Sequence, residues 1–383
     1  MNVKEIKYTV DLLQDKIFGD KDFPKSLSSQ EAGPSCIPGQ RRYLWTDSFG
    51  VLNYLSQYML VQSNKETFED FDENIYLSKA KTLINMIYRT LGQPRSDEFP
   101  MKIALCDKED DGFHYAGLRI GKVDARKGDT DVGMRFDGMY SHYIDKFIFA
   151  VQRYVYLSND REELKRLVRL IHEIHPLFFV PGKGYQWKIN VDGTSIPSLA
   201  SATSPSHDAL TSLVCYKLVD KLTDSKKALA REVADLEDVV NTYLSQHIHL
   251  LISKDELGIG MLLLTNQFFQ LDECESKAQS LCKTSNKIAR EVIEANVMTK
   301  YDSPDLNFRL YGALIGAQLR VYDEDLNKFA SHVVTSLVDK EMRVSQEESN
   351  HYAINKVMLA AALNPLALKS LSSEKDLVKT SFN

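Results

Sequence analysis

Long apolar runs and clusters of basic residues are both missing from this sequence of 383 residues. The longest apolar runs, such as Met261 to Leu264 and Val357 to Leu363, are far shorter than the roughly 20 residues of a membrane-spanning helix. The N-terminal segment Met1 to Phe18 carries charges every few positions and lacks the apolar stretch of a signal peptide. The formal net charge is -6, which disfavours a nucleic-acid surface. We therefore expect a soluble protein with no membrane or nucleic-acid partner.

Cysteine is also scarce and does not occur in CxxC pairs. The five cysteines are odd in number and widely spaced: Cys36, Cys106, Cys215, Cys274 and Cys282. This pattern favours reduced thiols over a disulfide framework or a zinc site. The sequence therefore predicts a cytoplasmic location, or another reducing compartment.

The common catalytic and metal-binding signatures are absent. The segment Gly117 to Val123, GLRIGKV, lacks the spacing and the Ser or Thr of a phosphate-binding loop. The segment His172 to His175, HEIH, is one residue too short for a zinc-binding HExxH, so His175 is expected to be a structural histidine. There is no GxSxG nucleophile motif. We expect neither a metal nor a cofactor.

What the sequence does contain is helical periodicity. In Val3 to Phe18 the apolar residues recur at one helical face, and Gly19 supplies a stop. Comparable patterns predict helices from Val51, and over 74–91, 138–157, 160–175, 207–222, 227–252, 258–271, 275–297, 304–321, 325–342 and 348–363. Pro176 is expected to help end the helix that Asp160 caps.

About twelve helices result, and strand signals are few. Short connections pair the later helices, and long loops separate the earlier ones. We therefore predict an all-α fold, an (α/α)6 toroid of about twelve helices in six hairpins with its long loops at one end. It would form a single domain over residues 1–368, followed by a mobile polar tail at 369–383.

The densest mixture of polar, aromatic and glycine residues feeds the helix predicted over 138–157. One stripe of this helix is apolar and is expected to be buried. On the adjoining stripe, which also holds His142, the pattern predicts solvated side chains for Lys146 and Arg153. Asp137 and Tyr140 lie at its start, within reach of a basic loop that contains Arg119 and Lys122.

Aromatic residues and carboxylates occur together in four places, each at or just before a helix start. The four clusters comprise Arg42, Tyr43, Trp45 and Asp47; Asp137, Tyr140 and His142; Tyr185, Trp187, Lys188 and Asp192; and His207 and Asp208. A flat aromatic face beside carboxylates is what a sugar-binding site needs. The alternative is that Asp47, Asp137 and Asp208 are helix N-caps. We expect the four clusters to converge at one end of the helical toroid.

These segments also resemble a known superfamily. The stretches RRYLWTDSFGVLNYL, GLRIGK, DGMYSHYIDKFIFAVQRY, HPLF to KINVD, SHDALTSLVCYKL and LGIGMLLL span roughly residues 41–265. Together they are similar to the six-hairpin, or (α/α)6-barrel, glycosidase-like superfamily. The resemblance implies either an inverting glycoside hydrolase with an acid and a base carboxylate, or a sugar epimerase that moves a proton with histidines.

Three functional hypotheses follow. The first is a carbohydrate-active hydrolase in which two of Asp47, Asp137, Asp192 and Asp208 act as general acid and base. The second is a sugar epimerase or isomerase that uses His142 and His207. The third is a non-catalytic helical scaffold with a vestigial pocket.

The expected ligand is a small sugar or another polar molecule. The residues expected to bind it are Arg42, Tyr43, Trp45, Arg119, Lys122, Tyr140, Trp187 and Lys188. The basic loop residues Arg119, Lys122, Arg126 and Arg135 further suggest an anionic group on the substrate. In the epimerase hypothesis, Arg119 or Lys122 polarises the carbonyl oxygen of the sugar.

Overall fold

A computed structural model gives the arrangement of most of the chain. The residues that it describes are 1–27, 32–33, 39–93, 95, 106–107, 114–115, 117–124, 136–196, 207–225, 227–246, 251–253, 255–268, 277–299, 305–319 and 324–374. They form two compact units. Unit 1 comprises Met1–Lys21, Leu52–Ala80 and Asn241–Asn383, and unit 2 comprises Asp22–Val51 and Lys81–Val240.

The described residues contain twelve α-helices. In chain order they are α1 Val3–Phe18, α2 Leu44–Gln62, α3 Asn74–Leu91, α4 Ser141–Ser158, α5 Arg161–Phe178, α7 Asp208–Asp220, α8 Ala230–Gln246, α9 Glu256–Asn266, α10 Lys277–Thr299, α11 Asn307–Gln318, α12 Glu324–Arg343 and α13 Tyr352–Leu363. The division between the units falls within α2, α3 and α8.

The β-strands of the described residues form short antiparallel pairs, and single β-bridges occur beside them. These pairs are β1 Cys106–Asp107 with β2 His114–Tyr115, β3 Met139–Tyr140 with β6 Lys188–Ile189, and β4 Phe179–Val180 with β5 Gly184–Tyr185. In unit 2 the pair β3–β6 joins the segment before α4 to the segment that carries Trp187.

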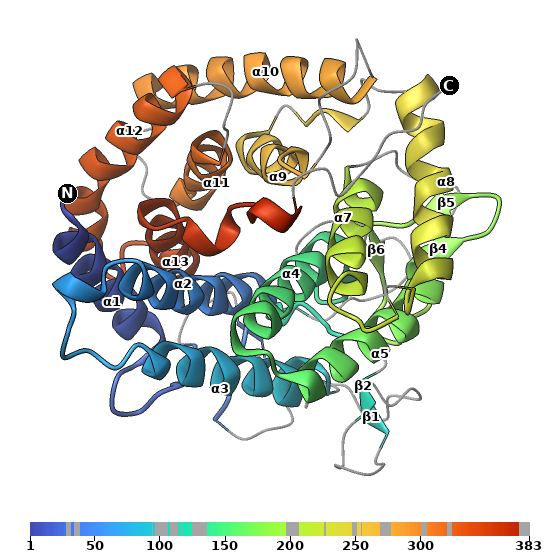
Figure 1. Cartoon of the computed structure of the whole chain (residues 1–383), viewed down its shortest axis with the longest axis horizontal. Helices are drawn as coiled ribbons and strands as arrows, with labels where there is room; N and C mark the ends of the chain where they lie inside the picture. The colour runs from blue at the N-terminus through green and yellow to red at the C-terminus, as the bar shows by residue number, and fades with distance from the viewer. Residues whose placement is uncertain are drawn as a thin grey trace. The chain divides into compact units, whose positions relative to one another are not determined.

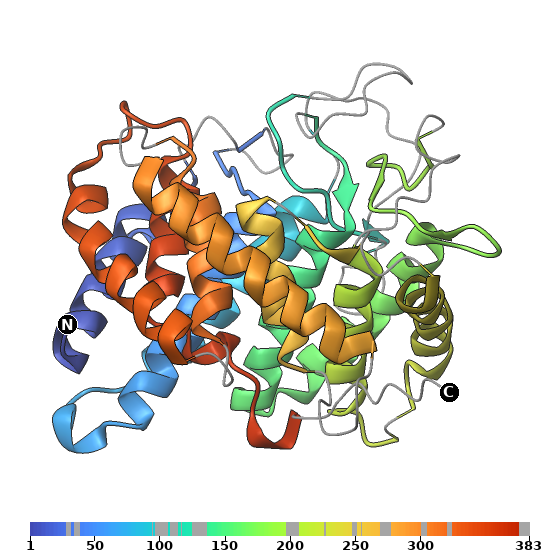
Figure 2. The ribbon, with the colours of Figure 1, turned by 90° about the horizontal axis from the view of Figure 1, so that it is seen from above.

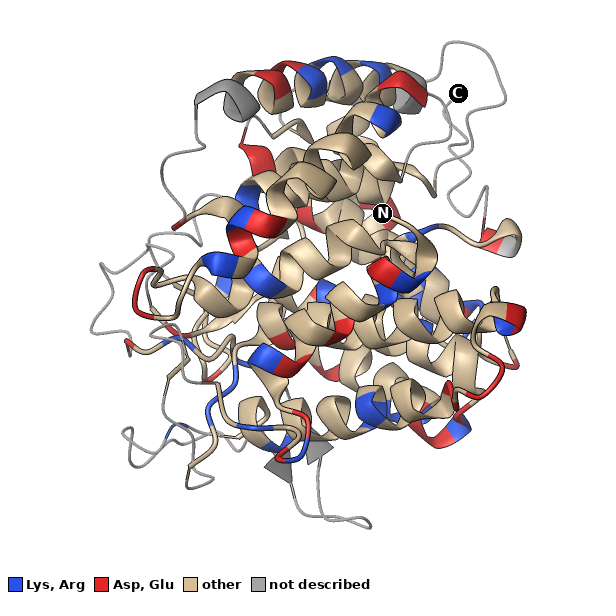
Figure 3. Cartoon of the chain, turned by 90° about the vertical axis from the view of Figure 1, so that its left-hand side faces the viewer, with Lys and Arg blue, Asp and Glu red and all other residues tan. Residues whose placement is uncertain are grey.

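Unit 1 consists of two layers of helices. The core helices of unit 1, α9, α11 and α13, are buried on almost every side, and α10, α12 and α1 pack against them (Figures 1 and 2). Figure 3 shows the charged residues along the chain. The covering helix α10 carries both signs of charge, with Lys283, Lys287 and Arg290 before Glu291 and Glu294. On α10 the pairs Lys287–Glu291 and Arg290–Glu294 lie one helical turn apart.

Glycine allows α9 and α11 to touch backbone to backbone. A Cβ atom on Gly260 would lie 2.0 Å from the carbonyl oxygen of Gly312, and one on Gly316 would lie 2.4 Å from the carbonyl oxygen of Gly260. No side chain fits at such a distance. The small residues of these two helices therefore set the closest helix contact in unit 1.

The core helices of unit 2 are α4 and α7. They pack on each other, and α5 packs against both (Figure 1). Helix α8 joins this group because its carboxylates accept hydrogen bonds from histidines of α5, including one from His175 Nε2 to Asp235 Oδ2 at 3.2 Å. The predicted structural role of His175 agrees with this contact and with its burial, which lowers the pKa of its imidazole.

The predicted helix limits are correct where local sequence determines them. Helix α1 runs from Val3 to Phe18 and ends at Gly19, as predicted. Helix α2 starts at Leu44, earlier than the predicted Val51. Helix α5 continues through Pro176 to Phe178, so the prediction that Pro176 ends it is wrong. The predicted N-cap of this helix is correct, because the carboxylate of Asp160 accepts a hydrogen bond from the backbone amide of Glu163.

The prediction of a solvated face on α4 is wrong. Lys146 and Arg153 are 2% and 1% exposed, because α4 is a core helix that α5 and α7 cover. The Arg153 guanidinium lies 4.7 Å from the centre of the Phe149 ring. The helix also starts at Ser141 instead of Gly138, because Met139 and Tyr140 pair with β6 as a strand.

No helix among the described residues is long and apolar enough to cross a membrane. Of the predicted reduced cysteines, Cys215 and Cys282 are buried and belong to no disulfide. Cys36 and Cys274 lie outside the described residues. Within the predicted tail, residues 369–374 are described and Ser372–Glu374 form a short 3-10 turn. Residues 375–383 lie outside the described part, so the mobile tail stays a prediction. The single domain over residues 1–368 also stays a prediction.

Candidate functional site

Asp137 holds together the loops that precede α4. Its Oδ2 atom lies 3.1 Å from Arg95 Nη1 and 2.9 Å from Arg119 Nη1. Its Oδ1 atom accepts hydrogen bonds from the backbone amides of Gly121 and Gly138. The carboxylate has no exposed surface. This enclosed, fourfold-bonded setting favours a structural role for Asp137 over one in which it meets a ligand.

The same network fixes the basic loop. Arg95 donates hydrogen bonds to the carbonyl oxygens of Lys122 and Val123. Gly121 has a φ of 83°, and a Cβ atom there would lie 2.3 Å from the carbonyl oxygen of Arg42. Only glycine fits this position. Arg95 was not among the predicted residues, since it lies alone in a long loop.

Asp47 is a second enclosed carboxylate. Its Oδ1 atom lies 3.3 Å from Arg42 Nη1, and neither side chain has exposed surface. Burial raises the pKa of Asp47 to about 6, although the Arg42 charge opposes this shift. Its Oδ2 atom is buried without a hydrogen-bond partner among the described residues. Asp47 therefore holds a proton more readily than an ordinary carboxylate.

Aromatic rings surround His142. The ring centre of His142 lies 4.9 Å from that of Tyr143, 5.9 Å from Tyr140, 6.2 Å from Trp187 and 6.4 Å from Trp45. Trp45 and Tyr140 are buried, whereas Trp187 is half-buried. The side chain of His142 itself is 22% exposed. A titratable imidazole thus lies among four flat apolar faces and keeps contact with solvent.

Asp208 faces this imidazole from the start of α7. The distance from His142 Nδ1 to Asp208 Oδ1 is 3.9 Å, and the Asp208 side chain is 6% exposed. At this separation the two groups attract each other when the imidazole is protonated. His207 lies at the N-cap position of the same helix and is half-buried.

A second polar contact joins the same two helices deeper in the unit. Ser212 Oγ lies 2.9 Å from both carboxyl oxygens of Asp145 and 3.0 Å from the Tyr185 hydroxyl oxygen. Burial raises the pKa of the Asp145 carboxyl well above its usual range, although Lys146 and the hydrogen bond from Ser212 oppose this. Sequence reasoning missed Asp145, and the available signal was that it is the one acidic residue in the sequence of α4.

Two lysines flank the tyrosines of this region. Lys122 Nζ lies 5.1 Å from the centre of the Tyr43 ring, and Lys188 Nζ lies 4.8 Å from that of Tyr140. The Tyr43 and Tyr143 hydroxyl oxygens are 2.6 Å apart. Lys122 is half-buried and Lys188 is buried. Positive charge therefore adjoins the aromatic surroundings of His142.

Contacts in unit 2 bring the four predicted clusters together. Trp45 of the first cluster and Trp187 of the third both lie beside His142 of the second, and Asp208 of the fourth faces the same ring. Asp192 is the exception, because its carboxylate accepts hydrogen bonds from the amide and hydroxyl of Thr194 in a local turn.

The N-cap alternative is wrong for all three aspartates to which it was applied. Helix α2 begins at Leu44, so Asp47 lies inside its first turns. Tyr140 occupies the N-cap position of α4 and His207 that of α7, which places Asp137 before a strand and Asp208 as the first helical residue.

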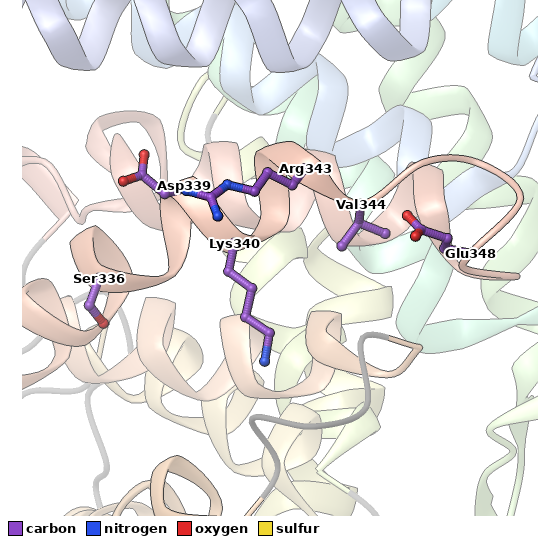
Figure 4. A pocket seen from close by; sticks show the side chains of 6 residues that line it. All are labelled: Ser336, Asp339, Lys340, Arg343, Val344 and Glu348. Atoms are coloured by element: carbon purple, nitrogen blue, oxygen red, sulfur yellow. The ribbon is translucent and has the colours of Figure 1, made fainter.

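Within the described residues, no group of three or more His, Cys, Asp or Glu side chains could hold a metal ion. A cavity of about 470 Å³ lies at the end of α12 in unit 1 (Figure 4). The described residues that line it are Ser336, Asp339, Lys340, Arg343, Val344 and Glu348. These side chains offer charges of both signs and no aromatic face, so this groove lacks the features that gather around His142.

Comparison with known proteins gave matches in structure but not in sequence. No protein-family model and no curated protein matches the sequence. A family 76 glycoside hydrolase from a bovine Bacteroides thetaiotaomicron strain aligns with a TM-score of 0.51 and 10% identity, over 96% of this chain and 78% of the hydrolase.

Two further structures are sugar epimerases, and both align with 94% of this chain and 98% of their own. A cellobiose 2-epimerase from Bacillus thermoamylovorans gives a TM-score of 0.48 at 11% identity. A sugar epimerase from a ruminal bacterium gives a TM-score of 0.46 at 11% identity.

The likeness to the family 76 hydrolase concerns the fold, because the identity is low. The expected resemblance to six-hairpin glycosidase-like proteins is confirmed at this level. The predicted fold class is confirmed with it: this chain has an all-α fold of the (α/α)6 toroid class.

Proposed function

We propose that this chain is a carbohydrate-active enzyme that moves a proton at the carbon beside a sugar carbonyl, as an epimerase or isomerase does. The setting of His142 carries this proposal. Its imidazole is 22% exposed, lies among four aromatic rings and faces Asp208 at 3.9 Å. Histidine exchanges protons near neutral pH, and flat rings stack on sugar faces.

Each residue then has a defined role. His142 removes the proton, and the Asp208 carboxylate orients the imidazole and stabilises its protonated form. The half-buried Trp187 ring supplies a stacking face. His207, next to Asp208, returns a proton on the opposite face of the carbon. The Lys122 ammonium stabilises the negative charge that develops on the carbonyl oxygen.

A two-carboxylate hydrolase is the second candidate, with Asp47 as general acid and Asp208 as general base. The observation in its favour is the pKa of Asp47, which burial raises to about 6 and which suits a general acid. Against it, the Asp47 side chain has no exposed surface and is paired with Arg42. Asp137 is enclosed in the same way.

We further propose that the substrate carries an anionic group. The half-buried Lys122 ammonium lies beside Tyr43, one of the aromatic residues near His142, and a positive charge at this place attracts an anion. A sugar carboxylate and a sugar phosphate both meet this requirement. Calorimetric titration with D-glucose, D-glucuronate and D-glucose 6-phosphate separates the two anions from each other and from a neutral sugar.

The reaction is tested by incubating the protein with D-glucose, D-glucuronate and cellobiose and analysing products by chromatography and NMR. An epimer or ketose supports the proposal. New reducing ends from cellobiose without an epimer support the hydrolase instead. Complete recovery of all three sugars would contradict both enzymes and favour the non-catalytic scaffold.

A further inference from the structure

Two pairs of polar side chains, one helical turn apart, lie in contact across α4 and α7. His142 and Asp145 are three positions apart on α4, and Asp208 and Ser212 are four apart on α7, so each pair shares one helix face. The first contact is His142 with Asp208, and the second is Asp145 with Ser212. The two contacts therefore lie one above the other between the two helices.

The second contact is the more rigid of the two. Asp145 is 1% exposed and Ser212 is fully buried, and the serine hydroxyl lies 2.9 Å from both carboxyl oxygens. A serine hydroxyl has one proton to donate. When Ser212 donates it to Asp145, the Tyr185 hydroxyl donates its proton to Ser212 Oγ across their 3.0 Å separation. The first contact is longer, at 3.9 Å, and partly exposed. The buried contact therefore leaves α4 less freedom to rotate against α7 than the partly exposed contact does.

We infer that Asp145 and Ser212 are a positioning pair, which sets the rotation of α4 against α7 so that the His142 imidazole meets the Asp208 carboxylate. The inference rests on the proposed function only for its effect on turnover. Neither residue touches the proposed substrate, and the pair acts through His142.

The neutral form of Asp145 is sufficient for this role. Burial opposes ionisation of the Asp145 carboxyl, and a neutral carboxyl group still bonds with Ser212. Asparagine offers similar size and hydrogen bonding without a charge, whereas leucine keeps the volume and removes the hydrogen bond. The pair Asp145→Asn and Asp145→Leu thus separates positioning from proton transfer.

The direct readout is the NMR signal of the His142 ring protons, assigned by its loss in His142→Gln. Four aromatic rings surround this imidazole, and their ring currents make its shift sensitive to its exact place. We expect Asp145→Leu and Ser212→Ala to move the signal by more than its linewidth, and Asp145→Asn to leave it close to the wild-type position. Ser285→Ala is the matched control, because Ser285 is fully buried and bonds to Leu281 of its own helix.

Turnover gives the second readout. Misplacement of the imidazole should lower kcat by roughly 10²-fold in Asp145→Leu and Ser212→Ala with little change in KM, and Asp145→Asn should show the smallest loss. A His142 signal that stays in place in both Asp145→Leu and Ser212→Ala would overturn the inference. If the signal moves while the wild-type protein acts on no sugar, the positioning pair stands and the proposed function fails. Because Ser212→Ala removes one hydroxyl, it keeps the test valid if Asp145→Leu does not fold.

Discussion

The core helices of unit 1 and unit 2 are buried to a similar extent but carry different side chains. In unit 1, α9, α11 and α13 are rich in Gly, Ala and Leu, and the contact of Gly260 with Gly312 sets their spacing. In unit 2, α4 and α7 hold His142, Asp145 and Asp208. Titratable groups are costly to bury in a helix interior and often mark functional sites, which is in keeping with the site proposed in unit 2.

Buried charge exists in unit 1 too, where it is closely paired, as Arg42 and Asp47 are in unit 2. Lys356 Nζ lies 3.2 Å from Glu341 Oε1, and the Tyr311 hydroxyl lies 2.9 Å from Glu341 Oε2. Neither member of the ion pair is accessible, at 0% and 1% side-chain exposure. In unit 2 the His142 side chain is 22% exposed. The two units therefore differ in whether a titratable side chain of a core helix is accessible to solvent, as His142 is in unit 2.

The largest effect should come from replacing His142. His142→Gln keeps a polar side chain of similar length but cannot exchange a proton near neutral pH, so turnover should fall by roughly 10²–10⁴-fold. The melting temperature should change little, since the ring is not fully buried. Kinetics and calorimetry on the same sample check both parts. A variant with wild-type turnover would remove His142 from the mechanism.

The second effect should be on stability alone. Lys356→Met leaves Glu341 buried without its cation and should cost about 3–5 kcal/mol of unfolding free energy. Lys328→Met is the control, because the pair of Lys328 with Glu324 is exposed and contributes less than about 1 kcal/mol. Chemical denaturation measures both. If Lys356→Met also lowered the turnover of the folded fraction, the assignment of the site to unit 2 would fail.

A smaller loss of stability is expected for Gly260→Ala. The added Cβ would meet the Gly312 carbonyl oxygen at 2.0 Å, and separating α9 from α11 should cost about 1–3 kcal/mol despite the better helix propensity of Ala. Gly182→Ala is the comparison, since Gly182 has a φ of 73° and no atom within 4 Å of its added Cβ. It should cost about 1–2 kcal/mol through backbone strain. Unchanged stability in Gly260→Ala would show that the helices separate freely.

The smallest effect concerns pH and again contrasts the units. Burial raises the pKa of Asp47 in unit 2 to about 6. The native state then binds more protons than the unfolded state between about pH 4 and 6, so this group lowers stability as pH rises through that window. Asp47→Asn cannot ionise. Its stability relative to wild type should therefore be more favourable at pH 7 than at pH 4.5, by roughly 1–2 kcal/mol.

Asp305 in unit 1 should behave in the opposite way. Although desolvation opposes it, hydrogen bonds from His351 and Ser349 lower the pKa of the Asp305 carboxyl. Its contribution to stability is present above the unfolded pKa and disappears as pH falls through the folded one. Denaturation of Asp305→Asn at several pH values should thus show the reverse trend to Asp47→Asn. Identical trends in the two variants would contradict this contrast.

Local sequence was sufficient to predict the features that depend on neighbouring residues. The repeat in Val3 to Phe18, with Gly19 behind it, determines α1 without help from the rest of the chain. The start of α4 could not be predicted in this way, because Met139 and Tyr140 pair with Lys188 and Ile189, far along the sequence. Periodicity likewise does not show which faces of a core helix are covered, and Lys146 was predicted to be solvated for this reason.

The candidate site was predictable in part. Its aromatic residues and carboxylates stood out as clusters, and the structure places Trp45, His142 and Asp208 together. Their different environments were not visible in the sequence. Asp137 and Asp208 look alike in sequence, but the first is enclosed by two guanidinium groups and two amides and the second faces an imidazole. Burial and partners, which depend on tertiary packing, separate them.

The central claim is that unit 2 moves a proton with His142, and hydrogen exchange measures this most directly. The protein is incubated in D2O with D-glucose and, separately, with D-glucuronate, and the sugar is followed by NMR. The account predicts that deuterium enters at the carbon beside the carbonyl with the wild-type protein and that His142→Gln reduces this exchange by at least about 10²-fold. Exchange that continues undiminished in His142→Gln, or products that form with no exchange at that carbon, would contradict the account.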